Sequence, residues 1–309
     1  MKPLRPRPSG KAAGTSVWPL MLEMPCWDDY ALLDMGAGEK LERYGSIVVR
    51  RPEPQAMGAR YLPAHDWDNA DATFTGDIEE EGSGRWRFRQ ELPDTWPLQY
   101  GPARFLGRFM SFRHVGVFPE QAAHWDWAMQ KINEAERPVR VLNLFGYTGL
   151  ASLLPATCGA QVTHVDASKK AIGWARENQA LSKLDDKPIR WICEDAVKFT
   201  QREIRRKNTY DAVIFDPPKF GRGPNGEVWN LFDDLPDMAD LVRQVLSDNP
   251  LFVLLSAYSI RASFLATHEL MREAFHDLPG KLESGELYIP EQAGGRALST
   301  SMFTRWSRA

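Results

Sequence analysis

The sequence predicts an α/β fold in which helices cover both faces of a mostly parallel β-sheet, preceded by a small β-rich domain. Three observations predict this architecture. From Val139 onward, short and almost entirely apolar runs alternate with amphipathic helical stretches, as in a parallel sheet buried on both faces. Between residues 26 and 112, turn-forming residues separate short apolar runs, which indicates a small β unit. Two strand-like runs joined by a turn come last, which predicts a terminal antiparallel hairpin.

The composition suits a globular protein large enough for two domains, with 309 residues of which 43% are hydrophobic. The formal net charge of -3 gives no overall basic field, so any RNA contact must depend on local patches. The three cysteines are too few for a disulfide framework or a metal cage, and no run approaches the length of a membrane span. We therefore expect a cytoplasmic protein with no metal and no membrane contact. Its oligomeric state is not predicted.

The predicted elements divide the chain into three parts. Residues 1–25 are rich in Pro, Gly, Lys and Arg, and we expect a flexible basic tail. Residues 26–112 form the small β-rich domain, and residues 113–309 form the α/β domain. A helix over residues 118–132, with Pro119 in its first turn, is expected to connect the two domains.

Within the α/β domain, strands and helices alternate in the order that a parallel sheet requires. The apolar runs that predict its first five strands are VRVLNLFG, QVTHVDAS, IRWICEDA, YDAVIFDPP and PLFVLLSAYS. The helical stretches begin near Leu150, near Ala171 and after Asp195, and two more cover residues 238–246 and 263–278. KLESGELYIPEQAGG and RALSTSMFTRWSR then predict the hairpin, for a sheet of seven strands.

The first predicted strand runs through Asn143 into a glycine-containing turn. This turn consists of Phe145, Gly146, Tyr147, Thr148 and Gly149. Glycines between a strand and a helix let a ligand approach the backbone, although they also serve turns that bind nothing. The spacing is not G-x-G-x-x-G, which argues against a pyrophosphate-containing cofactor.

Two aspartates follow the next two predicted strands. Asp166 comes about twenty residues after the turn, where a carboxylate can accept hydrogen bonds from both ribose hydroxyls. Asp195 ends the third strand, where it can accept from an adenine amino group. Either residue could instead cap a helix, but two acids at successive strand ends favour a shared ligand site.

The fourth strand ends in Asp216-Pro217-Pro218-Lys219-Phe220, which is the most specific motif in the chain. Two consecutive prolines fix the backbone and remove two amide donors, so the carbonyl of Pro217 is held rigidly at the strand end. A rigid acceptor next to the aromatic Phe220 suits a planar amine that stacks and donates together. The alternative is a strand exit stiffened by proline.

Together, LNLFGYTG, VDASKKAIGWARENQ, EDA and DPPKF resemble class I S-adenosylmethionine-dependent methyltransferases related to bacterial large-subunit (23S) ribosomal RNA methyltransferases. The resemblance implies a Rossmann-like methyltransferase sheet, S-adenosyl-L-methionine as cofactor, and a ribosomal RNA substrate. FRHVGVFPEQ resembles the segment that covers the cofactor in that family. The cofactor contacts implied are Phe118, Gln121, Asn143, Phe145, Gly146, Tyr147, Thr148, Gly149, Asp166, Ala167, Ser168, Asp195, Ala196 and Asp216. The catalytic residues implied are Asp216, Pro217, Pro218, Lys219 and Phe220.

The cysteines restrict the acceptor atom. Methylation at C5 of a pyrimidine needs a thiolate that adds to the ring, and relatives with this chemistry carry it after the fifth strand. Here that stretch reads Ser256-Ala257-Tyr258-Ser259, while Cys193 is expected inside the third strand. A ring nitrogen such as guanine N7 and an exocyclic amine both remain open. A protein side chain, a small planar molecule, or cofactor binding without transfer are the alternatives.

Two features could contact RNA. Arg85, Arg87 and Arg89 alternate with aromatic residues, so on a strand they would share one face, which could bind phosphates or merely face solvent. Residues 221–230, GRGPNGEVWN, directly follow the DPPKF motif and are expected to form a flexible lid or a plain connection.

Overall fold

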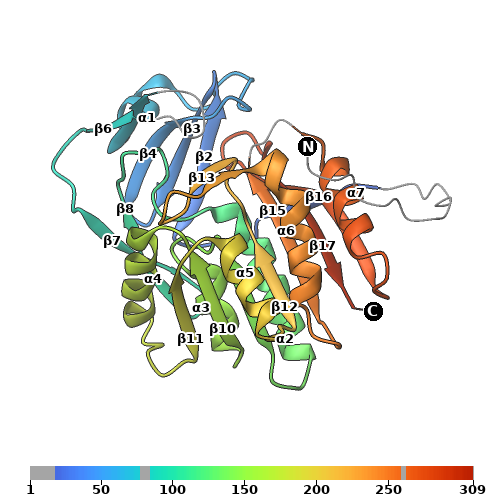
Figure 1. Ribbon diagram of the computed structural model, residues 1–309. Coiled ribbons are helices and arrows are strands. Elements are labelled where there is room, and N and C mark those ends of the chain that lie inside the picture. The colour runs from blue at the N-terminus through green and yellow to red at the C-terminus, as the bar shows by residue number, and fades with distance from the viewer. Residues whose placement is uncertain (1–17, 77–83, 259–261, 309) are drawn as a thin grey trace.

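A computed structural model describes residues 18–76, 84–258 and 262–308 of the chain. It contains one large mixed sheet, a separate five-stranded sheet and two short two-stranded ribbons (Figure 1). The predicted α/β class with an N-terminal β-rich region is therefore confirmed.

The large sheet has the strand order β1-β16-β17-β15-β12-β9-β10-β11. Seven of its strands were expected from the sequence, and among the described residues β17 alone runs antiparallel to its neighbours, β15 and β16. The strands span Leu20–Glu23 (β1), Arg140–Leu144 (β9), Gln161–Asp166 (β10), Ile189–Cys193 (β11), Ala212–Phe215 (β12), Phe252–Tyr258 (β15), Lys281–Pro290 (β16) and Ala297–Ser307 (β17). The central strands are buried on both faces, which explains their nearly continuous apolar sequence.

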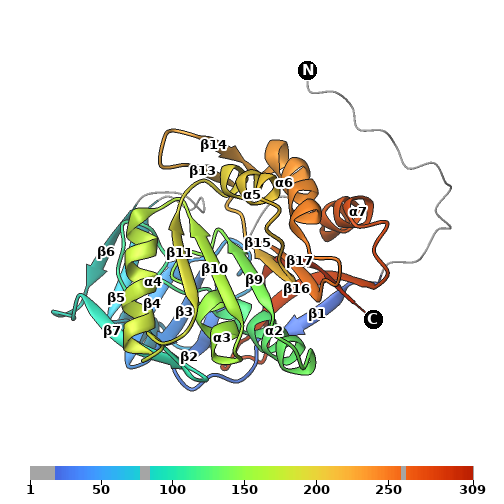
Figure 2. The same ribbon diagram turned by 60° about the horizontal axis from the view of Figure 1, so that its bottom comes forward.

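Helices cover both faces of this sheet (Figure 2). On one face lie α5, α6 and α7, whose apolar residues pack with those of β9, β12 and β15. On the other face lie α2 and α3, and α4 packs beside the edge strand β11. The helices span Pro119–Gln121 (η1, a 3₁₀ turn), Ala122–Glu134 (α2), Leu150–Thr157 (α3), Lys169–Leu181 (α4), Ala196–Arg205 (α5), Leu231–Val245 (α6) and Phe264–Ala274 (α7).

The N-terminal region forms a sheet of its own, in the order β2-β3-β4-β5-β6, with the short helix α1 against it. Its elements span Tyr30–Gly36 (β2), Glu39–Tyr44 (β3), Ile47–Pro52 (β4), Ala64–Asp68 (α1), Ala72–Gly76 (β5) and Gly84–Phe88 (β6). A ribbon follows, made of Thr95–Tyr100 (β7) and Ala103–Arg108 (β8). The rings of Trp27 and Tyr100 lie 6.4 and 5.3 Å from that of Trp125 in α2, so one apolar core joins this region to the large sheet.

Two sequence-based expectations differ from the structure. Residues 1–25 were expected to be a flexible tail, but Leu20–Glu23 forms β1, which pairs in parallel with β16 and adds an eighth strand; residues 1–17 lie outside the described part. Residues 221–230 were expected to form a flexible lid or a plain connection, but Phe220–Arg222 (β13) and Val228–Asn230 (β14) form an antiparallel ribbon. Short strands of mixed polarity lack the periodic pattern that predicts a strand.

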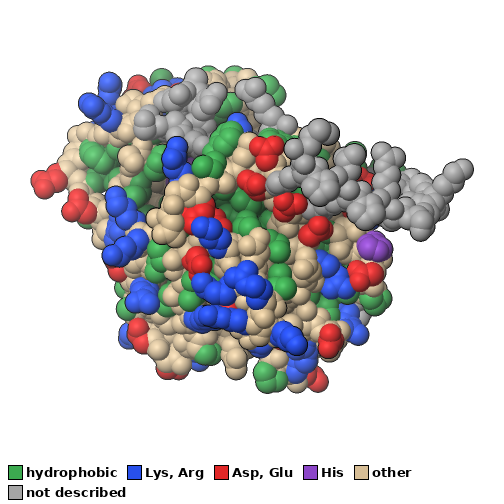
Figure 3. All heavy atoms as spheres, viewed as in Figure 1, with side chains coloured by type: hydrophobic (Ala, Val, Ile, Leu, Met, Phe, Trp, Pro, Cys, Tyr) green, Lys and Arg blue, Asp and Glu red, His purple; other side chains and the backbone are tan. Residues whose placement is uncertain are grey.

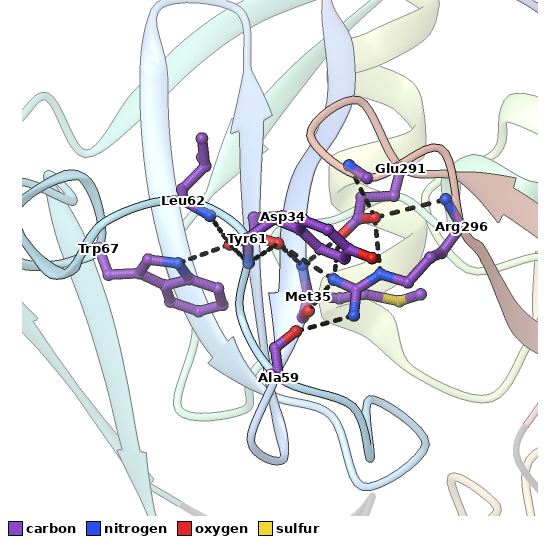
Figure 4. Close-up of polar contacts among 9 residues, drawn as sticks. Asp34, Met35, Ala59, Tyr61, Leu62, Trp67, Glu291 and Arg296 are labelled. Carbon is purple, nitrogen blue, oxygen red and sulfur yellow. Dashed lines mark hydrogen bonds and ion pairs between the residues drawn. The ribbon is translucent and has the colours of Figure 1, made fainter.

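The turn of the β16–β17 hairpin is joined to β2 by a cluster of polar contacts around Arg296 (Figure 4). The guanidinium of Arg296 lies 3.2 Å from Asp34 and donates to Glu291 at 2.8 Å and to the Ala59 carbonyl at 2.8 Å. Asp34, fully buried, also accepts from the indole of Trp67 at 2.9 Å. This Arg296 cluster fixes the N-terminal sheet to the end of the large sheet.

Candidate functional site

The carboxyl ends of four parallel strands meet at one edge of the large sheet. In the register, Leu144 pairs with both Val165 and Phe215, and Asp166 pairs with Cys193. The residues that follow these strands therefore lie side by side, in the position where open α/β sheets bind ligands. This edge brings together the predicted turn Phe145–Gly149 and the carboxylates Asp166, Asp195 and Asp216.

The turn after β9 has an unusual backbone. Phe145 and Tyr147 adopt positive φ angles of 57° and 50°, and Gly149, which precedes α3, has φ 92°. Left-handed conformations are costly for aromatic residues and persist where surrounding contacts enforce them, commonly at ligand sites. One such contact is the hydrogen bond from the Tyr147 amide to Asp166 Oδ2 at 2.9 Å, which ties the turn to the end of β10.

A buried polar network supports the turn from below. A Cβ at Gly146 would lie 2.4 Å from the His164 ring and 2.9 Å from Asn143 Nδ2, so glycine is required there by packing. Asn143 donates to Ser152 Oγ at 2.8 Å, and Ser152 lies 2.9 Å from His164 Nδ1. The Asn143 side chain, which the sequence predicts at the cofactor, thus supports the turn. Thr148 likewise donates inward, to the Gly116 carbonyl at 2.7 Å.

Asp166 is held at the end of β10 by two backbone amides. Its carboxylate accepts from Tyr147 and, at 2.8 Å, from Ser168. Burial raises its pKa, and these two hydrogen bonds oppose that shift. Ser168 in turn caps α4 by accepting from the Ala171 amide at 3.2 Å, and the Ala167 carbonyl lies within reach of the Cys193 thiol at 3.7 Å.

Asp195 caps α5, as the structural alternative anticipated. One carboxylate oxygen accepts from the Lys198 amide at 2.9 Å, and Ala196 is the buried first residue of the helix. Among the described residues nothing bonds to the other oxygen, which stays available for a ligand. A cap and a ligand contact are therefore compatible in one carboxylate, because each oxygen has its own lone pairs.

Asp216 is half-buried at the end of β12, in surroundings that favour the neutral form of its carboxyl group. Burial raises its pKa to about 7, and the nearby Glu120 carboxylate adds to the shift. Gln121 Nε2 lies 3.4 Å from Asp216 Oδ2, and Ser256 donates to Gln121 Oε1 at 3.2 Å. Gln121, predicted as a cofactor contact, is thus placed beside Asp216, while Glu120 was not anticipated because its role depends on this proximity.

The segment after Asp216 is anchored by a residue that sequence reasoning missed, Trp229 of β14. Its indole donates to the Pro218 carbonyl at 2.7 Å, and its ring lies 4.9 Å from that of Phe145. Pro217 is buried, whereas Phe220 is half exposed, with Lys219 Nζ 5.4 Å from its ring centroid. An apolar aromatic residue in the polar stretch GRGPNGEVWN was the only available signal.

Aromatic side chains cover the edge. The Phe118 ring lies 4.7 Å from His114, 5.4 Å from Tyr258 and 5.9 Å from Tyr147. Phe118 was predicted as part of this cover, while His114 and Tyr258 were not. Burial raises the pKa of Tyr258 to about 12. Ser259 lies outside the described residues.

One expectation about cysteine needs correction. Cys193 belongs to the third strand of the α/β domain, as expected, but it is the exposed last residue of β11 and so lies at the same edge as the site. However, β10 and β9 separate β11 from β12, so its thiol lies on the opposite side of the turn from Asp216. Neighbouring strands are about 4.8 Å apart, which puts the thiol out of reach of an acceptor at Asp216.

The hydrogen-bond acceptors at this edge fit an adenosyl cofactor. Asp166 offers a carboxylate at the strand end for vicinal hydroxyls, and Asp195 offers an unbonded oxygen for an amino group. The turn Phe145–Gly149, which follows β9, presents its strained backbone beside Asp166.

The predicted arginine stripe faces away from this site. Trp86 donates to the carbonyls of Met110 and Phe112, in the segment that leads to Phe118. Arg85 and Arg87 pair with Thr75 and Thr73 across β5 and are exposed on the opposite face of the N-terminal sheet.

Comparisons with known proteins agree with this geometry. A family model described as S-adenosylmethionine-dependent methyltransferase matches residues 78–275. A crystal structure of a SAM-dependent methyltransferase from Agrobacterium tumefaciens is 56% identical, with a TM-score of 0.91, over 94% of each chain. SMU.776, solved in complex with SAH, shares the fold at 18% identity and a TM-score of 0.70, over 90% of this chain and 75% of that one.

A curated relative, ribosomal RNA large subunit methyltransferase K/L from Shewanella sp. (strain ANA-3), is 31% identical over 150 residues. The match covers 48% of this chain and 20% of that protein, so the chain spans only about a fifth of the relative's length. Among the described residues, no helix combines the length and apolar character needed to cross a membrane.

Proposed function

Because the chain belongs to the family of S-adenosylmethionine-dependent methyltransferases, we propose that it methylates a nitrogen of an RNA base, with ribosomal RNA as the substrate. One observation carries the proposal: Asp216 is half-buried at the β12 end, next to two prolines, with a pKa raised to about 7 and with the Cys193 thiol three strands away. A polar edge of this kind suits a planar nitrogen acceptor and not a pyrimidine carbon.

The cofactor would be held by the edge of the sheet. Asp166 would accept from the ribose hydroxyls and Asp195 from the adenine, and the turn Phe145–Gly149 would border the methionine part. Phe118, with its aromatic neighbours, would exclude water from above. Bound S-adenosylmethionine supplies an electrophilic methyl group on a sulfonium sulfur.

The acceptor would be oriented by residues of the DPPKF motif. The Asp216 carboxylate and the Pro217 carbonyl would accept the hydrogens of an exocyclic amine, which aims its lone pair at the methyl carbon. Phe220, half exposed beside Lys219, would stack on the base. The protein thus contributes mainly position and hydrogen-bond acceptors, because methyl transfer from a sulfonium needs little covalent help.

Support for RNA comes from the relatives named as ribosomal RNA methyltransferases. Their matched part is a minor share of their length, so the substrate is inferred from the common catalytic segment alone. An acceptor of this kind would place the enzyme in the cytoplasm.

The test is radiolabel transfer from S-adenosylmethionine to RNA. We expect label in RNA from a strain lacking this protein and none in wild-type RNA, whose sites are already methylated. Nucleoside mass spectrometry would identify the modified nitrogen, and Asp166→Ala should abolish both cofactor binding and transfer. Label confined to protein or to small molecules would contradict an RNA substrate, and transfer to a pyrimidine C5 would contradict the proposed chemistry.

A further inference from the structure

The inner face of the N-terminal sheet carries buried charges towards the catalytic edge. Lys40 of β3 and Arg51 of β4 are cross-strand partners, and each is 4% exposed. Like charges directly opposite one another destabilise a sheet, and their burial adds to the cost. Such a pair therefore needs compensating anions.

Two carboxylates provide that compensation. Glu42 accepts from Arg51 Nε at 2.7 Å and Nη2 at 2.8 Å, and Glu53 lies 3.1 Å from Lys40 Nζ. Glu42 also accepts from the Tyr30 hydroxyl at 2.9 Å. Lys40 Nζ also lies 3.8 Å from Glu42, so the two carboxylates together match the charges of Lys40 and Arg51.

Arg113 is a third buried cation beside them, and it has no carboxylate. It is 3% exposed, and its backbone carbonyl accepts from Arg51 Nη1 at 2.8 Å. Among the described residues its own guanidinium makes one hydrogen bond, from Nη1 to the Pro52 carbonyl at 3.3 Å. Within the described part of the chain, no acidic side chain lies at ion-pair distance from it. A buried, unpaired guanidinium is costly for a folded protein to keep.

The unmatched charge lies next to the aromatic cover of the site. His114 follows Arg113 directly, and its ring contacts those of Phe118 and Tyr258. Burial, together with the charges of Arg51, Arg113 and Lys40, holds the pKa of His114 well below its usual value. Glu120, an acid of the catalytic edge, accepts from Ser301 at 3.1 Å, and burial raises its pKa. Neither side chain neutralises Arg113.

We propose that Arg113 binds an anionic oxygen group, a carboxylate or a phosphate, at the boundary between the N-terminal sheet and the catalytic edge. Guanidinium binds both groups through paired N–H donors. The two sources available are the amino-acid carboxylate of the cofactor and a phosphate of the acceptor. The inference rests on the proposed function, and it makes the N-terminal sheet a part of the binding site.

The experiment uses the full chain with Arg113→Met, which removes the charge, and Arg113→Lys, which keeps it. Titration calorimetry would measure the Kd of S-adenosylhomocysteine and of 5′-methylthioadenosine, which lacks the carboxylate. Methyl transfer would give KM for RNA from a strain lacking the protein. Arg243→Met is the control, because Arg243 lies on α6, outside the site, and pairs with Asp277.

If Arg113 binds the cofactor carboxylate, Arg113→Met should raise the Kd of S-adenosylhomocysteine about 10- to 100-fold and leave the Kd of methylthioadenosine unchanged. For an acceptor phosphate, KM should rise by a similar factor with both Kd values unchanged. In either case Arg113→Lys should recover part of the loss, and the Tm of Arg113→Met should not fall, because an unpaired buried charge is removed.

Unchanged Kd and KM in Arg113→Met would overturn the proposal, whatever its Tm. Equal weakening of the two nucleosides would also overturn it, because it would indicate a distorted pocket. Failure of the wild-type chain to bind S-adenosylhomocysteine would instead contradict the proposed function.

Discussion

The surroundings of Asp216 raise the pKa of its carboxyl group close to neutral pH. Burial disfavours the charged form, and Glu120 adds electrostatic repulsion, so that the pKa rises to about 7. The protonated acid cannot take up the proton that an amine loses on methylation, whereas the carboxylate can. The ionisation state of one side chain should therefore limit catalysis near neutral pH.

We expect kcat of the wild-type enzyme to rise with pH through about 7 and then level off. Asp216→Asn should lower kcat by about 100-fold or more, on the order expected for an acid–base residue, and should abolish this dependence while leaving cofactor Kd nearly unchanged. Single-turnover methyl transfer between about pH 5.5 and 9, a range that brackets this pKa, would measure both. A flat wild-type profile would indicate a ring nitrogen, which has no hydrogen to give up.

The stability of the folded protein should fall as pH rises, in the opposite sense to kcat. A folded-state pKa above the unfolded value, about 4, gives stability that is present below about pH 4 and lost as pH rises through about 7. Asp216→Asn should therefore match the wild type near pH 4 and have a higher Tm near pH 8. Thermal unfolding of both proteins at both pH values checks this. A Tm of Asp216→Asn below that of the wild type near pH 8 would contradict it.

At the scale of secondary-structure elements, the β13–β14 ribbon fixes the DPPKF segment. Trp229 connects the two halves of the site, since its indole binds the Pro218 carbonyl and its ring contacts Phe145. The ribbon therefore positions the acceptor side of the site relative to the cofactor turn.

Trp229→Phe keeps an aromatic ring but loses the hydrogen bond at 2.7 Å. We expect kcat to fall about three- to tenfold, from the net value of one hydrogen bond, with cofactor Kd changed less than about twofold. Phe232→Leu, at an exposed aromatic residue just beyond the ribbon, is the matched control. Loss of cofactor binding without loss of kcat would show that Trp229 supports the turn at Phe145 instead.

At the scale of the whole molecule, the Arg296 cluster joins the N-terminal sheet to the β16–β17 hairpin (Figure 4). Removing Arg296 would leave Asp34 and Glu291, 0% and 3% exposed, without their cation. Breaking a buried pair in this way costs about 3 kcal/mol, so Arg296→Ala should lower Tm by about 5 °C or more. Differential scanning calorimetry would measure the shift.

Arg243→Ala removes a more exposed ion pair, with Asp277, and should change Tm little. An equal effect of both substitutions would show that the Arg296 cluster contributes no more than a surface pair.

Across the face shown in Figure 3, acidic and basic side chains are interspersed, so RNA binding there would depend on local groups and not on an overall field.

The sequence by itself determined the class of fold and most elements of the site. Apolar runs alternate with stretches whose apolar residues recur with the helical period of 3.6. This order predicts a parallel sheet covered on both faces, and parallel strands bring their carboxyl ends to one edge. The turn Phe145–Gly149, Asp166, Asp195 and Asp216 can therefore be placed together from the order of the strands alone. The division of the chain at residues 112 and 113 stays a prediction.

Only the tertiary structure decided which residues from distant segments meet at that edge. Three groups of contacts leave no local sequence pattern: Glu120 with Asp216, Trp229 with Pro218, and Lys40, Arg51 and Arg113 with one another. They form because strands and segments fold back onto one another. The same holds for β1, whose four residues become a strand because β16 offers an unpaired edge. The periodicity of apolar residues indicates which face of an element is buried. Charge pairing and the burial of single groups depend on how all the elements pack together.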